Sequence, residues 1–151
     1  MRTVYLAGPI AGCTNGEARS WRNDASNFLR QFNLRGADPL RDESAPTGKF
    51  SKAEDFANDS GVTLSRAIAG KNWLDVRMCD AMLAYVPLLD RPTYGTIWEI
   101  GAFYALQKPI VLVSDNPAVF NHPDIDISCS WKYEDLDEGL AKIVQLLGPY
   151  T

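Results

Sequence analysis

One carboxylate stands out as the group in this chain best suited to covalent chemistry. Glu99 lies in the segment GTIWEIG (residues 95–101), where the spacing of apolar residues predicts a helix that begins near Gly95. The dipole of a helix favours the ionised form of a carboxylate in its first turn. In a partly dry cleft such a group serves as nucleophile or charge stabiliser in glycoside chemistry. An ordinary glutamate placed near a helix start for dipole reasons alone is the competing interpretation.

A loop of small residues follows the first predicted strand. That strand, residues 3–7, ends at Gly8-Pro9, and the chain continues through Ile10 without a GxGxxG or Walker pattern. Dinucleotide and P-loop nucleotide binding are therefore not supported. Backbone N–H groups of such a loop can still cradle a sugar or a phosphate. Tyr5 lies just before the loop, either to orient a carboxylate or to fill the core.

The remaining polar candidates lie before the third predicted strand or stand alone. Asn72 lies on the helix that leads into this strand, and the pattern does not settle where its side chain points. Asp80 is expected to bind backbone donors at the turn, and it is also kept as a candidate for substrate binding. His122 is the only histidine, and the three cysteines are scattered without a CxxC. We therefore expect neither a metal site nor a disulfide framework.

Short apolar runs alternate with helical periodicity along the chain, which is typical of βαβ units and a parallel sheet. We predict an α/β fold with a flavodoxin- or Rossmann-like, doubly wound, five-stranded parallel sheet in a three-layer α/β/α arrangement. Strands are predicted at residues 3–7, 34–39, 81–86, 109–113 and 127–131, and helices at 17–32, 64–78, 95–106 and from 135 onward.

The order of the strands decides where chemistry is expected. In a sheet with the order 2-1-3-4-5, ligands bind outside the carboxyl ends of the strands, where the order reverses. The loops after the first and third strands meet at that point. These loops begin at Gly8 and Pro87.

Length and composition predict one soluble domain over residues 1–151. The chain has 15 basic and 19 acidic side chains and a formal charge of −4, which lacks the positive footprint of a protein that binds nucleic-acid polymers. We expect no signal peptide, no membrane span and a cytoplasmic location, because no long apolar run occurs. Residues 41–62 are polar without a clear period and are expected to form a loop or lid insertion.

Four stretches of the sequence resemble the nucleoside 2-deoxyribosyltransferase family, including its relatives that hydrolyse deoxynucleoside monophosphates. They are VYLAGPI at 4–10, KNWLDVRMCDAMLAYVP at 71–87, YGTIWEIGAFYALQKPIVLV at 94–113 and DLDEGL at 135–140. The resemblance implies a flavodoxin-like fold and cleavage of the bond between base and deoxyribose. It also implies that no metal or organic cofactor is needed.

The resemblance assigns expected roles to single residues. Glu99 matches the nucleophile that attacks C1′ and forms a glycosyl-enzyme intermediate, and Tyr5 matches the tyrosine that hydrogen-bonds this glutamate. Gly8 and Ile10 match the loop that lines the sugar site. Members usually assemble as homodimers or higher homo-oligomers, in which a neighbouring subunit completes the site with a polar residue. Asn121 matches that residue.

Two acidic positions of the family pattern are changed in this chain. Asn72 stands where many members have an aspartate. Thr93, two residues before Gly95, stands where many have an acid that handles the base or the proton of the leaving group. Asp90 lies in the same loop and is a candidate substitute.

A third change concerns phosphate recognition and therefore the substrate. Ala11 stands where the hydrolase branch has an arginine for the 5′-phosphate, and Arg19 or Arg22 are candidate substitutes. We therefore expect an enzyme that transfers 2-deoxyribose between nucleobases of small nucleosides. Hydrolysis of a deoxynucleoside 5′-monophosphate is the alternative, and a catalytically weak nucleotide-binding module is the third hypothesis.

Overall fold

A five-stranded parallel sheet forms the centre of the molecule. The structure, a computed structural model, describes residues 1–41, 43–51, 62–90 and 93–149. The strand order is β2-β1-β3-β4-β5, and each neighbouring pair is parallel. This confirms the predicted doubly wound α/β fold, with the order reversing between β1 and β3. The strands are β1 (Arg2–Ala7), β2 (Leu34–Ala37), β3 (Ala81–Tyr85), β4 (Ile110–Val113) and β5 (Trp131–Tyr133).

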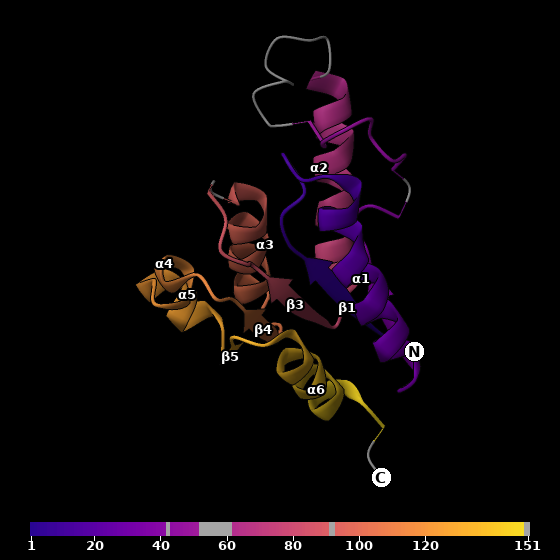
Figure 1. The fold of residues 1–151 in the computed structure, drawn as a ribbon. Helices are drawn as coiled ribbons and strands as arrows, with labels where there is room; N and C mark the ends of the chain where they lie inside the picture. Colours follow the sequence, from indigo (N-terminus) through magenta and orange to yellow (C-terminus); the bar gives the residue numbers. More distant parts are fainter. Residues whose placement is uncertain (42, 52–61, 91–92, 150–151) are drawn as a thin grey trace.

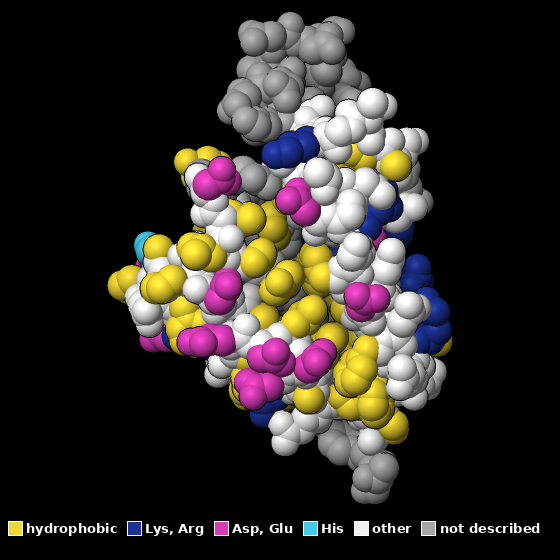
Figure 2. Space-filling model, in the orientation of Figure 1, with side chains coloured by type: hydrophobic (Ala, Val, Ile, Leu, Met, Phe, Trp, Pro, Cys, Tyr) yellow, Lys and Arg dark blue, Asp and Glu magenta, His cyan; other side chains and the backbone are white. Residues whose placement is uncertain are grey.

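Helices cover both faces of the sheet and complete the three layers (Figure 1). The first face carries α1 (Asn15–Arg30) and α6 (Leu136–Leu147), and the second carries α2 (Val62–Met78), α3 (Tyr94–Ala105) and the short α5 (Pro123–Ser128), which follows α4 (Pro117–Phe120). Figure 2 shows hydrophobic side chains in the middle of one side of the molecule, with acidic side chains around them.

The alternation of side chains along β1 decides which residues can reach which helices. Successive side chains of a strand point to opposite faces of the sheet. Val4 and Leu6 accordingly pack in the core beneath α1 and α6, whereas Tyr5 and Ala7 pack in the core beneath α2 and α3. Tyr5 therefore faces the helix that carries Glu99.

The chain between β4 and α6 differs from the prediction. The predicted strand at 127–131 is wrong in position, because Ile127 belongs to α5 and the strand is Trp131–Tyr133. The segment between β4 and β5, for which no helix was predicted, forms α4 and α5. Pro123 starts α5, where its missing N–H costs nothing, and the His122 ring accepts a hydrogen bond from the N–H of Asp124.

Part of the expected lid segment packs beside the loop after β1. Phe50 accepts a backbone hydrogen bond from Gly12 at 3.0 Å and donates one to Cys13 at 2.8 Å. Residues 42 and 52–61 of the expected lid lie outside the described residues. The helix expected from residue 64 begins at Val62.

Gly8 allows the loop after β1 to lie directly against the end of β3. A Cβ atom at this position would lie 2.7 Å from Cζ2 of Trp21 and 2.9 Å from the backbone oxygen of Tyr85. The backbone oxygen cannot move aside as the end of a flexible side chain would. A glycine is therefore required here for packing.

We predict that Gly8→Ala destabilises the protein, by about 1–3 kcal/mol, because the methyl group overpacks a tight contact. Gly16→Ala is the matched control, since a Cβ there meets nothing within 4 Å and alanine is the better helix former. Urea unfolding of the two variants measures the difference. Equal stability of Gly8→Ala and the wild type would contradict the packing described here.

Candidate active site

Tyr5 and Glu99 meet in the core between the sheet and α3. The Tyr5 hydroxyl donates a hydrogen bond to Oε1 of Glu99 at 2.6 Å, across 94 positions of sequence. This length lies in the range typical of a hydroxyl bound to an ionised carboxylate. Glu99 is 7% exposed and Tyr5 is fully buried. The pair thus presents a carboxylate that is oriented by one donor and largely shielded from water.

Burial controls the charge of this carboxylate. It is the main cause that raises the pKa of Glu99 from 4.5 to about 7, and the nearby Asp75 carboxylate contributes in the same direction. The Tyr5 hydrogen bond and the positive charge of Arg22 act in the opposite direction. Burial and the neighbouring Glu99 also raise the pKa of Tyr5 far above its usual value. Tyr5 therefore stays protonated and remains a hydrogen-bond donor at every working pH.

Arg22, on α1, is a buried charge beside the loop after β1, and the sequence analysis considered it only as a candidate phosphate ligand. Its side chain is fully buried, and it donates hydrogen bonds to the backbone oxygens of Leu6 at 3.1 Å, Gly8 at 2.8 Å and Ala18. Ala18, Ala25 and Leu29 are also buried on α1. The sequence signal for this buried charge was the position of Arg22 among the apolar residues on one face of the helix.

The two arginines proposed as phosphate ligands, Arg19 and Arg22, donate hydrogen bonds to other groups of the protein. The donors of Arg22 are directed to the carbonyls just described. Arg19 donates to Oδ1 of Asn15 and to the backbone oxygens of Leu40 and Glu43. Both side chains fasten α1 to neighbouring backbone.

Asp75 on α2 acts on the charge of the site, and the predicted site residue Asn72 lies on the same helix. Asp75 accepts two hydrogen bonds from Arg41, at 2.6 and 2.8 Å, and its charge acts on both Tyr5 and Glu99. Asn72 lies one turn earlier on α2, and its Oδ1 atom is buried without a hydrogen-bond partner. A buried amide oxygen without a donor is costly, and it is satisfied when a ligand supplies one. Asp75 was missed because its role depends on packing between distant segments.

The start of α1 lies directly after the loop of small residues and forms a complete capping box. Thr14 Oγ1 accepts a hydrogen bond from the N–H of Glu17 at 3.2 Å, and the Glu17 carboxylate accepts one from the N–H of Thr14 at 2.7 Å. The N–H groups of Gly12 and Cys13 also bind backbone oxygens of the protein. The T-x-x-E pattern at 14–17 was the available sequence signal for this helix start.

Five other predicted site residues lie in the loop after β1 and at the start of α3. Gly8, Pro9 and Ile10 lie in the loop after β1, and Thr93 and Gly95 lie at the start of α3, where open space surrounds the Gly95 Cα.

Asp80 and Asn121 lie elsewhere. Asp80 accepts a hydrogen bond from the N–H of Thr3 at 2.7 Å, at the amino ends of the strands. This contact matches the structural role expected for Asp80, and we leave it out of the proposed site. Asn121 is exposed at the end of α4.

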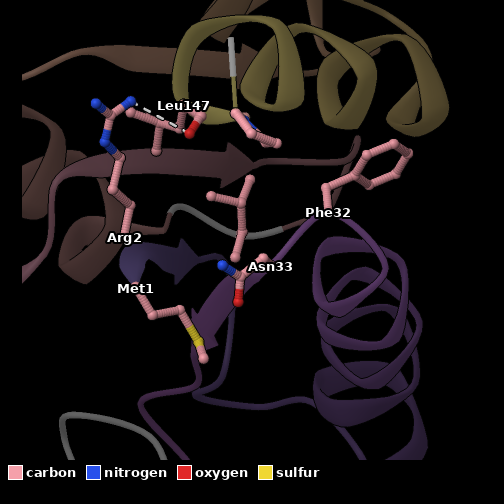
Figure 3. Close-up of a pocket in the computed structure, with 8 residues that line it drawn as sticks. Met1, Arg2, Phe32, Asn33 and Leu147 are labelled. Carbon is pink, nitrogen blue, oxygen red and sulfur yellow. Dashed lines mark hydrogen bonds between the residues drawn. The ribbon is translucent and has the colours of Figure 1, made fainter. Parts of the chain in front are cut away.

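A pocket at the amino ends of β1 and β2 is separate from this site (Figure 3). Met1, Arg2, Phe32, Asn33 and Leu147 line it. It is open and contains none of the residues that surround Glu99.

Other reactive groups do not compete with Glu99 in the described part of the chain. Burial raises the pKa of the Cys79 thiol to about 11 and that of Cys129 to about 12, so both remain protonated at neutral pH. Among the described residues no group of three or more His, Cys, Asp and Glu side chains is placed to hold a metal. No described helix has the length and apolar character needed to cross a membrane.

Residues 4–141 match the family described as nucleoside 2-deoxyribosyltransferase. The chain belongs to this family. Membership supports an enzyme that acts on the N-glycosidic bond of nucleosides or nucleotides. A search of curated protein sequences gives no match.

Two solved structures are similar in fold to this chain. A 2-desoxiribosyltransferase from Leishmania mexicana has a TM-score of 0.66 and 15% identity, and the match covers 96% of this chain and 98% of that one. A CMP N-glycosidase from Clostridium botulinum has a TM-score of 0.59 and 16% identity, over 97% of this chain and 100% of that one. At these identities the likeness shows only that this chain and the two solved structures share a fold.

We predict that Glu99→Gln stabilises this family member much more at pH 8 than at pH 5. Below about pH 4.5 the glutamate carries its proton in both the folded and the unfolded states. Between pH 4.5 and about 7 the unfolded chain releases this proton first, so the folded state loses stability as the pH rises. The neutral amide in the variant does not titrate. The free energy of unfolding of Glu99→Gln should therefore exceed that of the wild type by up to about 3 kcal/mol at pH 8.

Urea unfolding at both pH values measures the effect. Glu134→Gln is the control, because Glu134 is exposed and its replacement should change stability little at either pH. A stability difference between Glu99→Gln and the wild type that is the same at pH 5 and at pH 8 would show that the carboxylate is not buried as described.

Proposed function

We propose that this protein transfers 2-deoxyribose between nucleobases through a covalent glycosyl-Glu99 intermediate. The observation that carries this proposal is the buried carboxylate of Glu99, oriented at 2.6 Å by the Tyr5 hydroxyl. A module that only binds nucleotides has no need of an oriented, shielded carboxylate. Membership of the nucleoside 2-deoxyribosyltransferase family supports the same chemistry.

The reaction proceeds in two displacements at C1′. A carboxylate oxygen of Glu99 attacks C1′ of the deoxynucleoside, the bond from C1′ to the base nitrogen breaks, and the base leaves with a proton. A nitrogen of the second base then attacks C1′, and the ester bond to Glu99 breaks. Two inversions give retention at C1′. Tyr5 directs the carboxylate and stabilises its charge when the ester is cleaved.

The residues around this pair supply candidate substrate contacts. Gly8, Pro9 and Ile10 would line the sugar, and Thr93 and Gly95 would border the base. The buried, unpartnered Oδ1 of Asn72 supports its role as an acceptor for a ligand donor. Asp90, in the loop after β3, is the candidate donor of the proton to the leaving base. Asn121 keeps its proposed role in the site of a neighbouring subunit.

The start of α1 favours nucleosides over 5′-monophosphates. A helix N-terminus binds phosphate because its N–H groups are unpaired and its dipole end is positive. Here the Glu17 carboxylate occupies this end, and Thr14 caps it. A phosphate would meet a like charge, with Arg19 and Arg22 both directed to backbone oxygens. Substrate without a phosphate avoids this repulsion.

Hydrolysis of a nucleoside 5′-monophosphate is the second candidate function. It uses the same attack by Glu99, but water in place of a second base cleaves the ester. The fold likeness to the CMP N-glycosidase supports it, whereas the capped start of α1 opposes it. A catalytically weak binding module is the third candidate.

A chromatographic assay distinguishes the three functions. The protein is incubated with deoxyinosine and free adenine, and separately with each deoxynucleoside 5′-monophosphate. Formation of deoxyadenosine supports transfer, and release of base from the monophosphates alone supports hydrolysis. Ligand binding without either reaction supports the binding module.

We predict that Glu99→Ala lowers base exchange by roughly 10³-fold or more, because the nucleophile is lost. Tyr5→Phe should slow exchange about 10- to 100-fold, which is the loss of one hydrogen bond to a charged group. Wild-type turnover in the Glu99→Ala variant would rule out the assigned nucleophile. Unchanged kinetics in Tyr5→Phe would contradict the role of the hydroxyl.

We also propose that the protein is a homo-oligomer, in a cytoplasmic setting. An exposed apolar surface on α2 and α3 supports self-association, and Trp73 and Trp98 pack edge to face on it at 5.8 Å. We call this the α2–α3 apolar surface; its residues are Trp73, Leu74, Met78, Tyr94, Ile97, Trp98, Tyr104 and Leu106.

We predict that Leu74→Lys lowers the molar mass measured by light scattering, because a charge is placed on the α2–α3 apolar surface. Ile127→Lys is the matched control, since Ile127 is equally apolar and 68% exposed, but lies on α5. A monomeric wild type, or an equal effect of both changes, would contradict the proposed surface.

A further inference from the structure

The sheet itself does little to fix the orientation of the Tyr5 ring. The partners of Tyr5 in the two neighbouring strands are Ala37 of β2 and Met82 of β3. All three side chains belong to the same core. Alanine has only a methyl group, and the methionine side chain is flexible and adapts to the space around it. Neither of these two neighbours is a rigid group that would hold the plane of an aromatic ring.

Phe103, on α3, supplies a rigid contact to this ring. The rings of Phe103 and Tyr5 are stacked, with their centres 6.0 Å apart and an angle of 19° between the ring planes. Both side chains are fully buried in the same core. The separation lies in the range of favourable aromatic pairs. Close packing in a core holds such side chains in single rotamers, so the two rings fix each other.

The position of Phe103 on α3 connects this contact to Glu99. Phe103 lies four residues after Glu99 on the same helix, and residues at this spacing lie on one face of a helix. Tyr5 therefore meets α3 at two points, because its ring packs on Phe103 and its hydroxyl donates to Oε1 of Glu99 at 2.6 Å. The hydroxyl is rigidly joined to the ring, so a contact that fixes the ring also fixes the donor.

Phe103 is itself held near the end of α2. The ammonium group of Lys108 lies 5.6 Å from the centre of the Phe103 ring, which is within the range of a cation–π interaction. Lys108 also donates hydrogen bonds to the backbone oxygens of Val76 at 3.0 Å and Cys79 at 2.7 Å. The ring that packs on Tyr5 thus has fixed contacts of its own.

We propose that Phe103 is a positioning residue for the reaction of Glu99: its ring holds the Tyr5 ring in the orientation from which the hydroxyl reaches the Glu99 carboxylate. The inference deepens the proposed function and rests on it for its meaning in catalysis. Phe103 is fully buried and acts through Tyr5. A donor that is already in place costs no reorganisation when it stabilises the carboxylate released on cleavage of the ester.

The first test is a double-mutant cycle on base exchange. Phe103→Leu keeps an apolar side chain at this position but removes the ring. In the wild type, Tyr5→Phe is expected to slow exchange about 10- to 100-fold. In the Phe103→Leu background it should slow exchange less than about threefold, because the unsupported hydroxyl has already lost its effect and residues in contact are coupled. An equal factor in the two backgrounds overturns the proposal.

Leu112→Val is the matched control for this cycle. Leu112 is fully buried in the same core but lies on β4, two strands away from β1. A shorter side chain there loosens the core and leaves the ring that packs on Tyr5 in place. Tyr5→Phe should therefore slow exchange by the wild-type factor in this background. A factor reduced as much as in Phe103→Leu overturns the proposal, because any loss of core packing would then have the same effect.

The second test observes the Tyr5 hydroxyl directly and does not depend on activity. Tyrosine is labelled with 13C at Cζ, and the Tyr5 signal is assigned by its loss in Tyr5→Phe. In an equal mixture of H2O and D2O, a hydroxyl that exchanges slowly with solvent gives two Cζ lines, and one that exchanges rapidly gives a single line. We expect two lines in the wild type and in Leu112→Val, and a single line in Phe103→Leu. Two lines in Phe103→Leu, or a single line in either of the other proteins, overturns the proposal.

A second variant serves if Phe103→Leu does not fold. Phe103→Met also removes the ring, and methionine fills irregular space in a core, so it replaces Phe103→Leu in both tests with the same expected results.

The two tests separate this proposal from the proposed function. If base exchange is absent in the wild type but the Cζ lines change as expected, the proposed function fails and the positioning of Tyr5 by Phe103 stands. If exchange is present but the cycle shows no coupling, the role of Phe103 in the reaction fails and the proposed function stands.

Discussion

The structure depends on the burial of one carboxylate at the side of a parallel sheet. Burying Glu99 strengthens its interactions with charged and polar neighbours, because little water remains to screen them. The same burial favours the protonated, unreactive form of the group. The surrounding elements each address this conflict: β1 supplies the Tyr5 hydroxyl, α1 supplies Arg22, and Arg41 binds the opposing charge of Asp75. The arrangement of helices around β1 can be understood from this constraint.

The sequence predicted the sheet well because each strand has its own local signal. Apolar runs bounded at one end by Gly or Pro mark β1, β3 and β4. The strand order was assumed from the common doubly wound arrangement, and the structure confirms it. The prediction for the region between β4 and α6 was wrong for a local reason. Its prolines and polar residues suggest a loop, yet Pro117 and Pro123 occupy first turns of short helices, where proline is favoured.

The candidate site was only partly predictable. Glu99 was singled out from its position near a helix start and Tyr5 from its position before the loop. The family resemblance then implied the hydrogen bond between them, which the structure contains. Asp75 was not assigned to the site, and Arg22 was considered only as a candidate phosphate ligand. Their effect on Glu99 arises from packing among α1, α2 and the sheet, which apolar periodicity along a single helix does not reveal. The effect of a charged residue on the inward face of a helix is therefore hard to predict from the sequence pattern and requires a structure.

The capping box of α1 links substrate choice to stability of the fold. Glu17 and Thr14 satisfy each other's backbone donors, which contributes on the order of 1 kcal/mol to a helix. An evolutionary path toward phosphorylated substrates would have to remove this carboxylate, and so would weaken the helix that carries Arg22. A loss of about 1 kcal/mol is a modest but real part of the roughly 5–15 kcal/mol by which a domain is stable, so such a change would lower stability without unfolding the protein. A cap that maintains a helix thereby also limits which substrates the enzyme can acquire.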